Sequence, residues 1–143
     1  MAAVSVIYHN RSGELTLEQV AAADGGPSNR YILRVNMFAN ERIDRADGME
    51  MIAAMEAFYK LFDKDKQFAH LFDIKTVYIP SPDLILATIN LMRENHVFFQ
   101  SHLLFSTVVT EHAETLRTYM RGWKPTKPIH YLNAVDDIYT LFN

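Results

Sequence analysis

The sequence predicts an α/β domain in which helices pack on a mixed β-sheet. Two observations carry this prediction. β-Branched and alternating segments crowd the first quarter of the chain, and segments of helical and strand periodicity alternate after it. Such alternation is typical of parallel strands joined by right-handed helical crossovers. No repeat, low-complexity tract or linker divides the 143 residues, so we expect one domain over residues 1–143.

Three strands are expected in the N-terminal part. Residues 4–9 are β-branched and aromatic, residues 10–13 supply turn formers, and residues 14–20 alternate apolar with polar, which together predict a hairpin. The small, Gly-Pro-containing residues 21–29 are typical of a surface loop. Residues 31–37 then predict a third strand.

Helices and strands alternate in the rest of the chain. Met51, Met55 and Tyr59 recur at helical spacing and predict a helix with one buried face over residues 47–62. The remaining expected elements are a strand over 68–79, a helix from 82 to as far as 100, a strand over 104–110, a helix through 116–123, a strand over 129–132 and a terminal helix over 135–142. Asn133 and Asp136 resemble a capping pair for that last helix.

Ser81 stands at the expected start of a helix, before Pro82 and Asp83. Serine suits the capping position, proline the first turn, and aspartate the positive end of the helix dipole. Ser81 is therefore a candidate helix cap. It is also a candidate phosphoacceptor, because phosphate is electrostatically favoured at a helix N-terminus.

Residues 72–84, Phe-Asp-Ile-Lys-Thr-Val-Tyr-Ile-Pro-Ser-Pro-Asp-Leu, resemble the strand-to-helix junction of the STAS domain family, the anti-sigma factor antagonists and their relatives. The tail over 129–142 is similar to the last strand and helix of that family, and the order of elements is STAS-like over roughly residues 31–142. The resemblance implies a protein-interaction role, with nucleotide or lipid binding in some members. The family's phosphorylated serine aligns with Pro82, which leaves Ser81 as the neighbouring hydroxyl.

The patterns that mark common catalytic and metal-binding sites are missing from the sequence. It contains no cysteine, its six histidines lack HxH or HExxH spacing, and its five glycines form neither GxGxxG nor a Walker loop. No nucleophile elbow is present. We therefore expect no catalytic residues, no metal site, no cofactor and no enzymatic activity.

Charge and hydropathy bear on the partners and the cellular location of the chain. The formal net charge of −3 is spread in mixed sign, which disfavours a nucleic-acid partner. No apolar run reaches the length that spans a bilayer, so we expect no membrane insertion and a cytoplasmic location.

The leading functional hypothesis is a non-enzymatic interaction or assembly module that binds a protein partner or its own copies, and a regulatory role is part of this hypothesis. Its expected interface contains Phe98 and Phe99, because two consecutive phenylalanines do not both fit one narrow buried helical stripe.

Two other hypotheses remain open. A small-ligand binder, for a lipid or a nucleotide, would hold its ligand in an apolar pocket between sheet and helices. The residues expected to line it are Phe72, Tyr78, Phe105 and Tyr131. An enzyme of unrecognised type would instead need polar groups to converge at the strand ends, near Asp73, Ser81, Thr110 and His130.

Overall fold

The chain folds into a six-stranded mixed sheet with helices packed on it, which confirms the predicted fold class. A computed structural model describes residues 4–142. The strands are β1 (Val4–His9), β2 (Gly13–Ala21), β3 (Pro27–Met37), β4 (Gln67–Ile74), β5 (Leu103–Thr110) and β6 (Ile129–Tyr131). The helices are α1 (Arg45–Leu61), α2 (Pro82–Glu94), α3 (His96–His102), α4 (Ala113–Tyr119) and the 3₁₀ helix η1 (Val135–Phe142).

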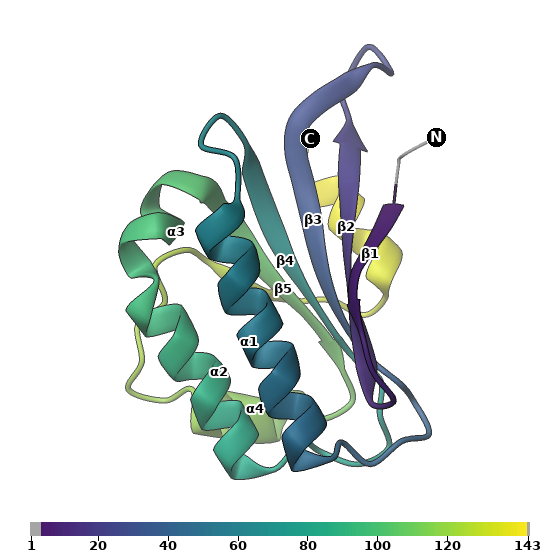
Figure 1. Cartoon of the computed structure of the whole chain (residues 1–143), viewed down its shortest axis with the longest axis vertical. Coiled ribbons are helices and arrows are strands. Elements are labelled where there is room, and N and C mark those ends of the chain that lie inside the picture. Colours follow the sequence, from purple (N-terminus) through teal and green to yellow (C-terminus); the bar gives the residue numbers. More distant parts are fainter. Residues whose placement is uncertain (1–3, 143) are drawn as a thin grey trace.

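The strands lie in the sheet in chain order, from β1 to β6. β1, β2 and β3 pair antiparallel, while β3, β4, β5 and β6 pair parallel. Each parallel connection therefore crosses to the next strand in the same direction, and right-handed crossovers place all their helices on one face. Figure 1 shows α1 and α2 side by side over that face, with η1 behind the sheet.

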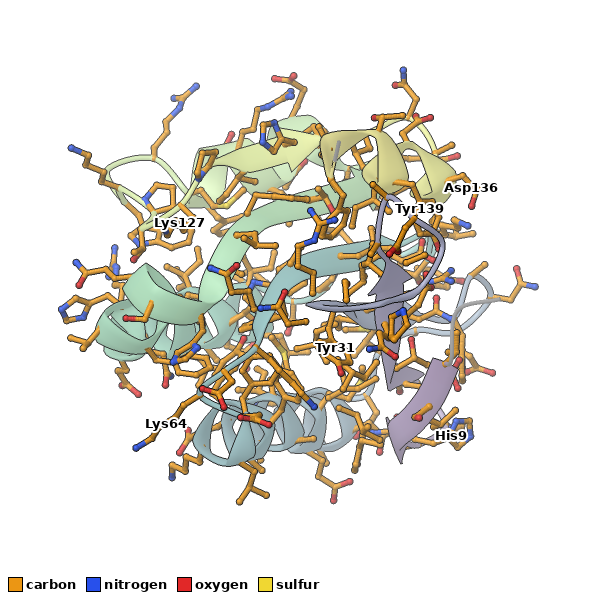
Figure 2. The ribbon with its side chains drawn as sticks, turned by 90° about the horizontal axis from the view of Figure 1, so that it is seen from above. His9, Tyr31, Lys64, Lys127, Asp136 and Tyr139 are labelled. Carbon is orange, nitrogen blue, oxygen red and sulfur yellow. The ribbon has the colours of Figure 1, made fainter. Side chains whose placement is uncertain are left out.

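Two apolar clusters flank the sheet. The larger one lies between the sheet and α1 to α4 and includes Leu33, Met51, Met55 and Phe99. The smaller one lies under η1. Figure 2 shows this layering from above, with Lys64 beyond the α1 side of the sheet and Tyr139 on the η1 side.

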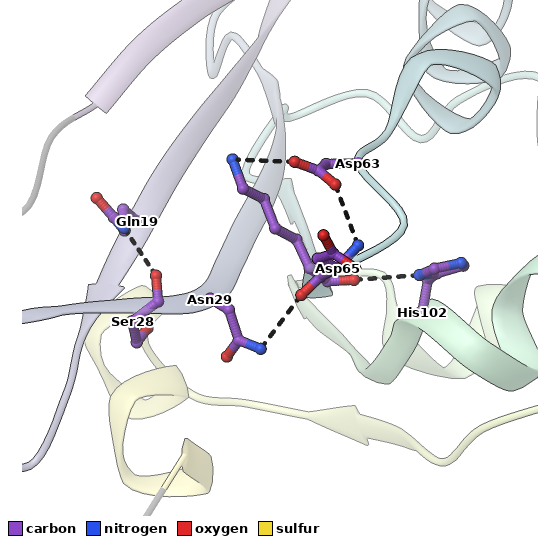
Figure 3. Close-up of polar contacts among 7 residues, drawn as sticks. Gln19, Ser28, Asn29, Asp63, Asp65 and His102 are labelled. Atoms are coloured by element: carbon purple, nitrogen blue, oxygen red, sulfur yellow. Dashed lines mark hydrogen bonds and ion pairs between the residues drawn. The ribbon is translucent and has the colours of Figure 1, made fainter.

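Short polar contacts fix the ends of α1. Asp44 caps its N-terminus by accepting hydrogen bonds from the amides of Ala46 and Asp47. After the helix, the Asp63 side chain accepts from the amide of Asp65 at 3.1 Å, and His102 Nδ1 donates to the Lys66 carbonyl at 3.1 Å (Figure 3). These contacts join the turn after α1 to the end of α3.

Four predicted boundaries were wrong. The helix predicted through 116–123 begins earlier, at Ala113, and ends at Tyr119. The predicted loop over 21–29 is shorter, because Pro27 already pairs with Ala21 in the β2–β3 hairpin. The predicted strand over 68–79 ends at Ile74, where the ladder to β3 also ends, and Val77 beyond it is 66% exposed.

The predicted helix over 82–100 is divided at Asn95. Asn95 has a non-helical φ of −104° and ψ of 19°, and this break in the backbone separates α2 from α3. Its side chain donates to the Leu91 carbonyl at 2.8 Å, which its own backbone amide also contacts. The capping pair of the terminal helix is also shifted by one residue. The Asp137 side chain accepts from the Ala134 amide, in place of the predicted Asn133 and Asp136.

Candidate functional site

An apolar cavity of about 110 Å³ lies between the helices and the parallel half of the sheet. α1, α2, α4 and strands β3 to β6 all contribute to its wall. The lining residues are Val35, Met37, Ile43, Gly48, Met51, Ile52, Met55, Phe72, Ile74, Pro80, Leu84, Ile85, Thr88, Ile89, Met92, Ser106, Val108, Leu116, Met120, Trp123 and Ile129. No charged side chain is among them.

Sequence order explains why the cavity forms at this place. Three crossovers in succession put α1, α2 and α4 on the same face, and the short α4 covers only part of the sheet beside α2. Flexible side chains such as Met51, Met55 and Met92 fill irregular space there. Native interiors contain few voids larger than a water molecule, so a cavity of this size is a specific feature of the fold.

A buried polar trio borders the cavity. Tyr59 of α1, His70 of β4 and Ser106 of β5 are 3%, 0% and 1% exposed. The Tyr59 hydroxyl lies 2.7 Å from His70 Nε2, and Ser106 Oγ lies 3.0 Å from His70 Nδ1. The parallel register pairs His70 with Ser106, so both side chains leave the sheet on the helix side.

Burial makes this trio electrically neutral. Desolvation lowers the pKa of His70 to about 3 and raises the pKa of Tyr59 above its usual value. At neutral pH the imidazole therefore holds one proton and the phenol keeps its own. Ser106, at one end of the trio, also belongs to the cavity wall.

Sequence reasoning missed this trio. His70 interrupts an apolar run in β4, which marks it as a buried polar group in need of partners. Tyr59 was predicted only as part of a helical apolar face. Ser106 comes within hydrogen-bond distance of His70 because of the strand register, which the amino-acid pattern does not fix.

The pocket predicted between sheet and helices is lined by different residues. Of the four expected lining residues, only Phe72 contributes to the wall. Tyr78 is 43% exposed in the segment after β4, and Phe105 packs beneath η1. Tyr131 packs against the larger cluster without lining the cavity.

Ser81 precedes α2 as predicted, in the capping position with Pro82 next. Its side chain makes no cap hydrogen bond, so the predicted capping contact is wrong. Within residues 4–142 its buried hydroxyl oxygen has no hydrogen-bond partner. The phosphoacceptor role of Ser81 stays a prediction.

The predicted exposed patch at Phe98 and Phe99 is wrong for Phe99, which is 1% exposed. Its ring centroid lies 5.0 Å from that of Tyr59. Phe98 is half-buried and packs against Phe68 and His102. Both rings face inward because α3 is a separate short helix over a wide aromatic cluster, rather than a continuation of the narrow α2 stripe.

The residues named for an unrecognised enzyme do not form a cluster in the described part of the chain. Asp73 pairs with Arg34, Thr110 accepts from the His112 amide, and His130 is exposed beside Phe105. No side-chain hydrogen bond or ion pair within the described residues 4–142 joins any two of Asp73, Ser81, Thr110 and His130.

Asp73 forms a buried ion pair on the face of the sheet that carries η1. Its carboxylate is 0% exposed and is paired with the Arg34 guanidinium, with Lys75 Nζ 3.7 Å from the same oxygen. The second carboxylate oxygen has no partner within residues 4–142. This pair lies across the sheet from the cavity.

The described residues offer neither a metal-binding cluster nor a membrane-spanning helix. Residues 4–142 contain no group of three or more histidine, aspartate or glutamate side chains placed to hold a metal ion. No helix in that range is long and apolar enough to cross a membrane.

Comparison of the chain with protein-family models, with curated proteins and with solved structures finds no match. The STAS resemblance therefore stays a prediction.

Proposed function

We propose that this chain is a small-ligand binding protein that holds a compact apolar molecule in the cavity between α1, α2, α4 and the sheet. The cavity itself is the observation that supports this proposal, because its volume of about 110 Å³ is lined by apolar side chains from seven elements and is partly open to the surface. An engineered apolar cavity of about 150 Å³ takes up benzene, so a slightly smaller one suits a molecule of about five or six carbon atoms.

Energetics favour a bound molecule over a void. Apolar side chains around unfilled space lose the contacts that a packed core would give them. A ligand that restores the missing contacts recovers part of the lost free energy. Of the two ligand classes expected from the sequence, the uncharged wall favours an apolar molecule over a nucleotide.

A titration with methylenecyclopentane, which has six carbon atoms, tests the proposal. We expect saturable chemical-shift changes in amide NMR spectra, concentrated on residues of the cavity wall. Val108→Ile adds a methyl group to the wall and should weaken binding roughly tenfold. Val109→Ile is the matched control, because the next residue of the same strand packs beneath η1.

Two results would oppose the proposal. One is the absence of saturable shifts in the wild-type protein. The other is an equal affinity of the wild-type protein and the Val108→Ile variant, which would place the hydrocarbon elsewhere.

Self-association through β1 is a second candidate, in line with an assembly module. β1 pairs only with β2 within residues 4–142, and its Val4 and Val6 are 59% and 60% exposed. An apolar edge strand offers free backbone groups to another strand. A second copy would pair its β1 antiparallel with this one.

Native mass spectrometry over a range of concentrations tests this second candidate. A dimer in the wild-type protein that is lost in Val6→Lys would support edge pairing, since a lysine on an edge strand opposes it. Met49→Lys changes an exposed apolar residue of α1 and serves as the control. A monomer at every concentration would remove the candidate.

A further inference from the structure

The trio beside the cavity contains one more proton than its own hydrogen bonds use. Tyr59 has one hydroxyl proton, Ser106 has one, and neutral His70 carries one ring proton. Two hydrogen bonds join the three groups, at Nε2 and at Nδ1 of His70. Because one ring nitrogen donates and the other accepts, one hydroxyl proton, of Tyr59 or of Ser106, is left without a partner in the trio.

The surroundings of Tyr59 decide which proton is left. Rings of Phe68, Phe98 and Phe99 lie around Tyr59, with centroids 6.0, 5.6 and 5.0 Å away. Within residues 4–142 its hydroxyl has no hydrogen-bond partner besides His70. A phenol is also a stronger donor than an aliphatic hydroxyl. These two features assign Tyr59 as the donor to Nε2 and Nδ1–H as the donor to Ser106, and this assignment leaves the proton of Ser106 over.

That proton lies at the cavity wall. Thr88 is the other hydroxyl side chain of the wall, and its proton already goes to the Leu84 carbonyl at 2.9 Å. The wall holds no charged side chain that would balance an ionised ligand. An unpartnered buried donor is costly, so a ligand that accepts this proton gains relative to one that does not.

We propose that the ligand of this cavity is a neutral apolar molecule with one hydrogen-bond acceptor, such as the carbonyl oxygen of a ketone, aldehyde or ester, bound to the Ser106 hydroxyl. The inference rests on the proposed ligand-binding function and adds the chemical class of the ligand. Tyr59 and His70 act as positioning residues that fix the direction of the Ser106 proton.

The first test examines the ligand-free protein. The ¹⁵N chemical shifts of the His70 ring distinguish a protonated nitrogen from an unprotonated one. We expect Nδ1 to be protonated and Nε2 to be the acceptor. A proton on Nε2 would overturn the inference, because Ser106 would then donate to His70 and have no proton for a ligand.

The second test compares two probes of the same shape, cyclopentanone and methylenecyclopentane, which differ by a carbonyl oxygen in place of a CH₂ group. We expect Ser106→Ala to reduce the preference for the ketone, expressed as the ratio of the two Kd values, by roughly fivefold, the value of one neutral hydrogen bond. Ser101→Ala, an exposed serine of α3, is the matched control and should leave the ratio unchanged.

The outcomes separate the two proposals. If neither probe binds the wild-type protein, the ligand-binding function itself fails. If both bind and Ser106→Ala leaves the ratio unchanged, the function stands and the role of Ser106 is overturned. Should Ser106→Ala not fold, Ser106→Cys keeps the side-chain shape with a much weaker donor and is expected to reduce the ratio in the same direction.

Discussion

The Tyr59 hydroxyl and His70 Nε2 lie 2.7 Å apart in the core, between two elements that contact across the helix–sheet layer. His70 also forms a hydrogen bond with Ser106 on the neighbouring strand, so two contacts fix the orientation of its ring. A buried histidine that is fully engaged on both nitrogens stays neutral in the folded state and gains a proton on unfolding.

Stability should fall as the pH falls below the normal histidine range. Burial lowers the pKa of His70 to about 3, whereas the unfolded chain titrates near 6.5. Between these values the unfolded state binds more protons, so the free energy of unfolding decreases with falling pH, by roughly 2 kcal/mol from pH 7 to pH 5. Urea unfolding at both pH values measures this change. His70→Gln should lack this component, and an equal decrease in that variant would assign the pH dependence to other groups.

Gly13→Ala should destabilise the fold. A Cβ at Gly13 would lie 2.5 Å from the Asn36 carbonyl oxygen and 3.0 Å from Met51 Cε. The carbonyl belongs to the paired strand β3 and cannot move without disturbing the ladder, so we expect a loss of about 2 to 4 kcal/mol in urea unfolding. In Gly26→Ala the new Cβ meets only the Asp24 side chain, at 3.2 Å, and the loss should stay below about 1 kcal/mol. Equal losses would contradict the steric account.

Replacing Arg34 alone should destabilise the fold more than replacing both Arg34 and Asp73. Arg34→Met leaves the buried Asp73 carboxylate with Lys75 alone, at 3.7 Å, and we expect a loss of about 2 kcal/mol or more. The double variant Arg34→Met/Asp73→Val removes the uncompensated charge and should recover most of that loss. Guanidinium unfolding of four proteins, the wild type, Arg34→Met, Asp73→Val and the double variant, completes the cycle. Additive losses would show that the two residues are not coupled.

Shortening one buried side chain of η1 should lower the stability of the protein. Ile138 is 0% exposed and packs in the cluster that includes Leu71 and Phe105. We expect Ile138→Ala to cost about 2 to 5 kcal/mol. Tyr139→Phe changes the next residue, which is 42% exposed and bonds Glu18, and should cost under about 1 kcal/mol. Thermal unfolding compares them, and a small effect at Ile138 would indicate that η1 is loosely packed.

The periodicity of the sequence predicted most elements because each pattern is local. Met51, Met55 and Tyr59 face the core at the expected helical spacing. The break at Asn95 was missed because a single residue with non-helical backbone angles makes it. For a similar reason Phe99 was assigned to the surface, since the direction of a short separate helix depends on tertiary packing.

The candidate site was less predictable than the fold. A pocket between sheet and helices was expected, and Phe72 was a correct lining residue. The strand register that brings Ser106 beside His70 is set by long-range pairing. The cavity is also space that the neighbouring helices leave unfilled. Its size and position depend on how those helices lie relative to one another, and no local sequence pattern encodes that arrangement.

The identity of strand order and chain order has a consequence for how the protein folds during synthesis. Each new strand finds its partner in the strand made just before it, so loops closed along the way stay short and the entropy cost of each closure is small. η1 is the exception. Its Phe142 carbonyl accepts a hydrogen bond from Arg30, 112 positions earlier, so the strands can pair one after another while one face of the sheet stays uncovered until η1 has been made.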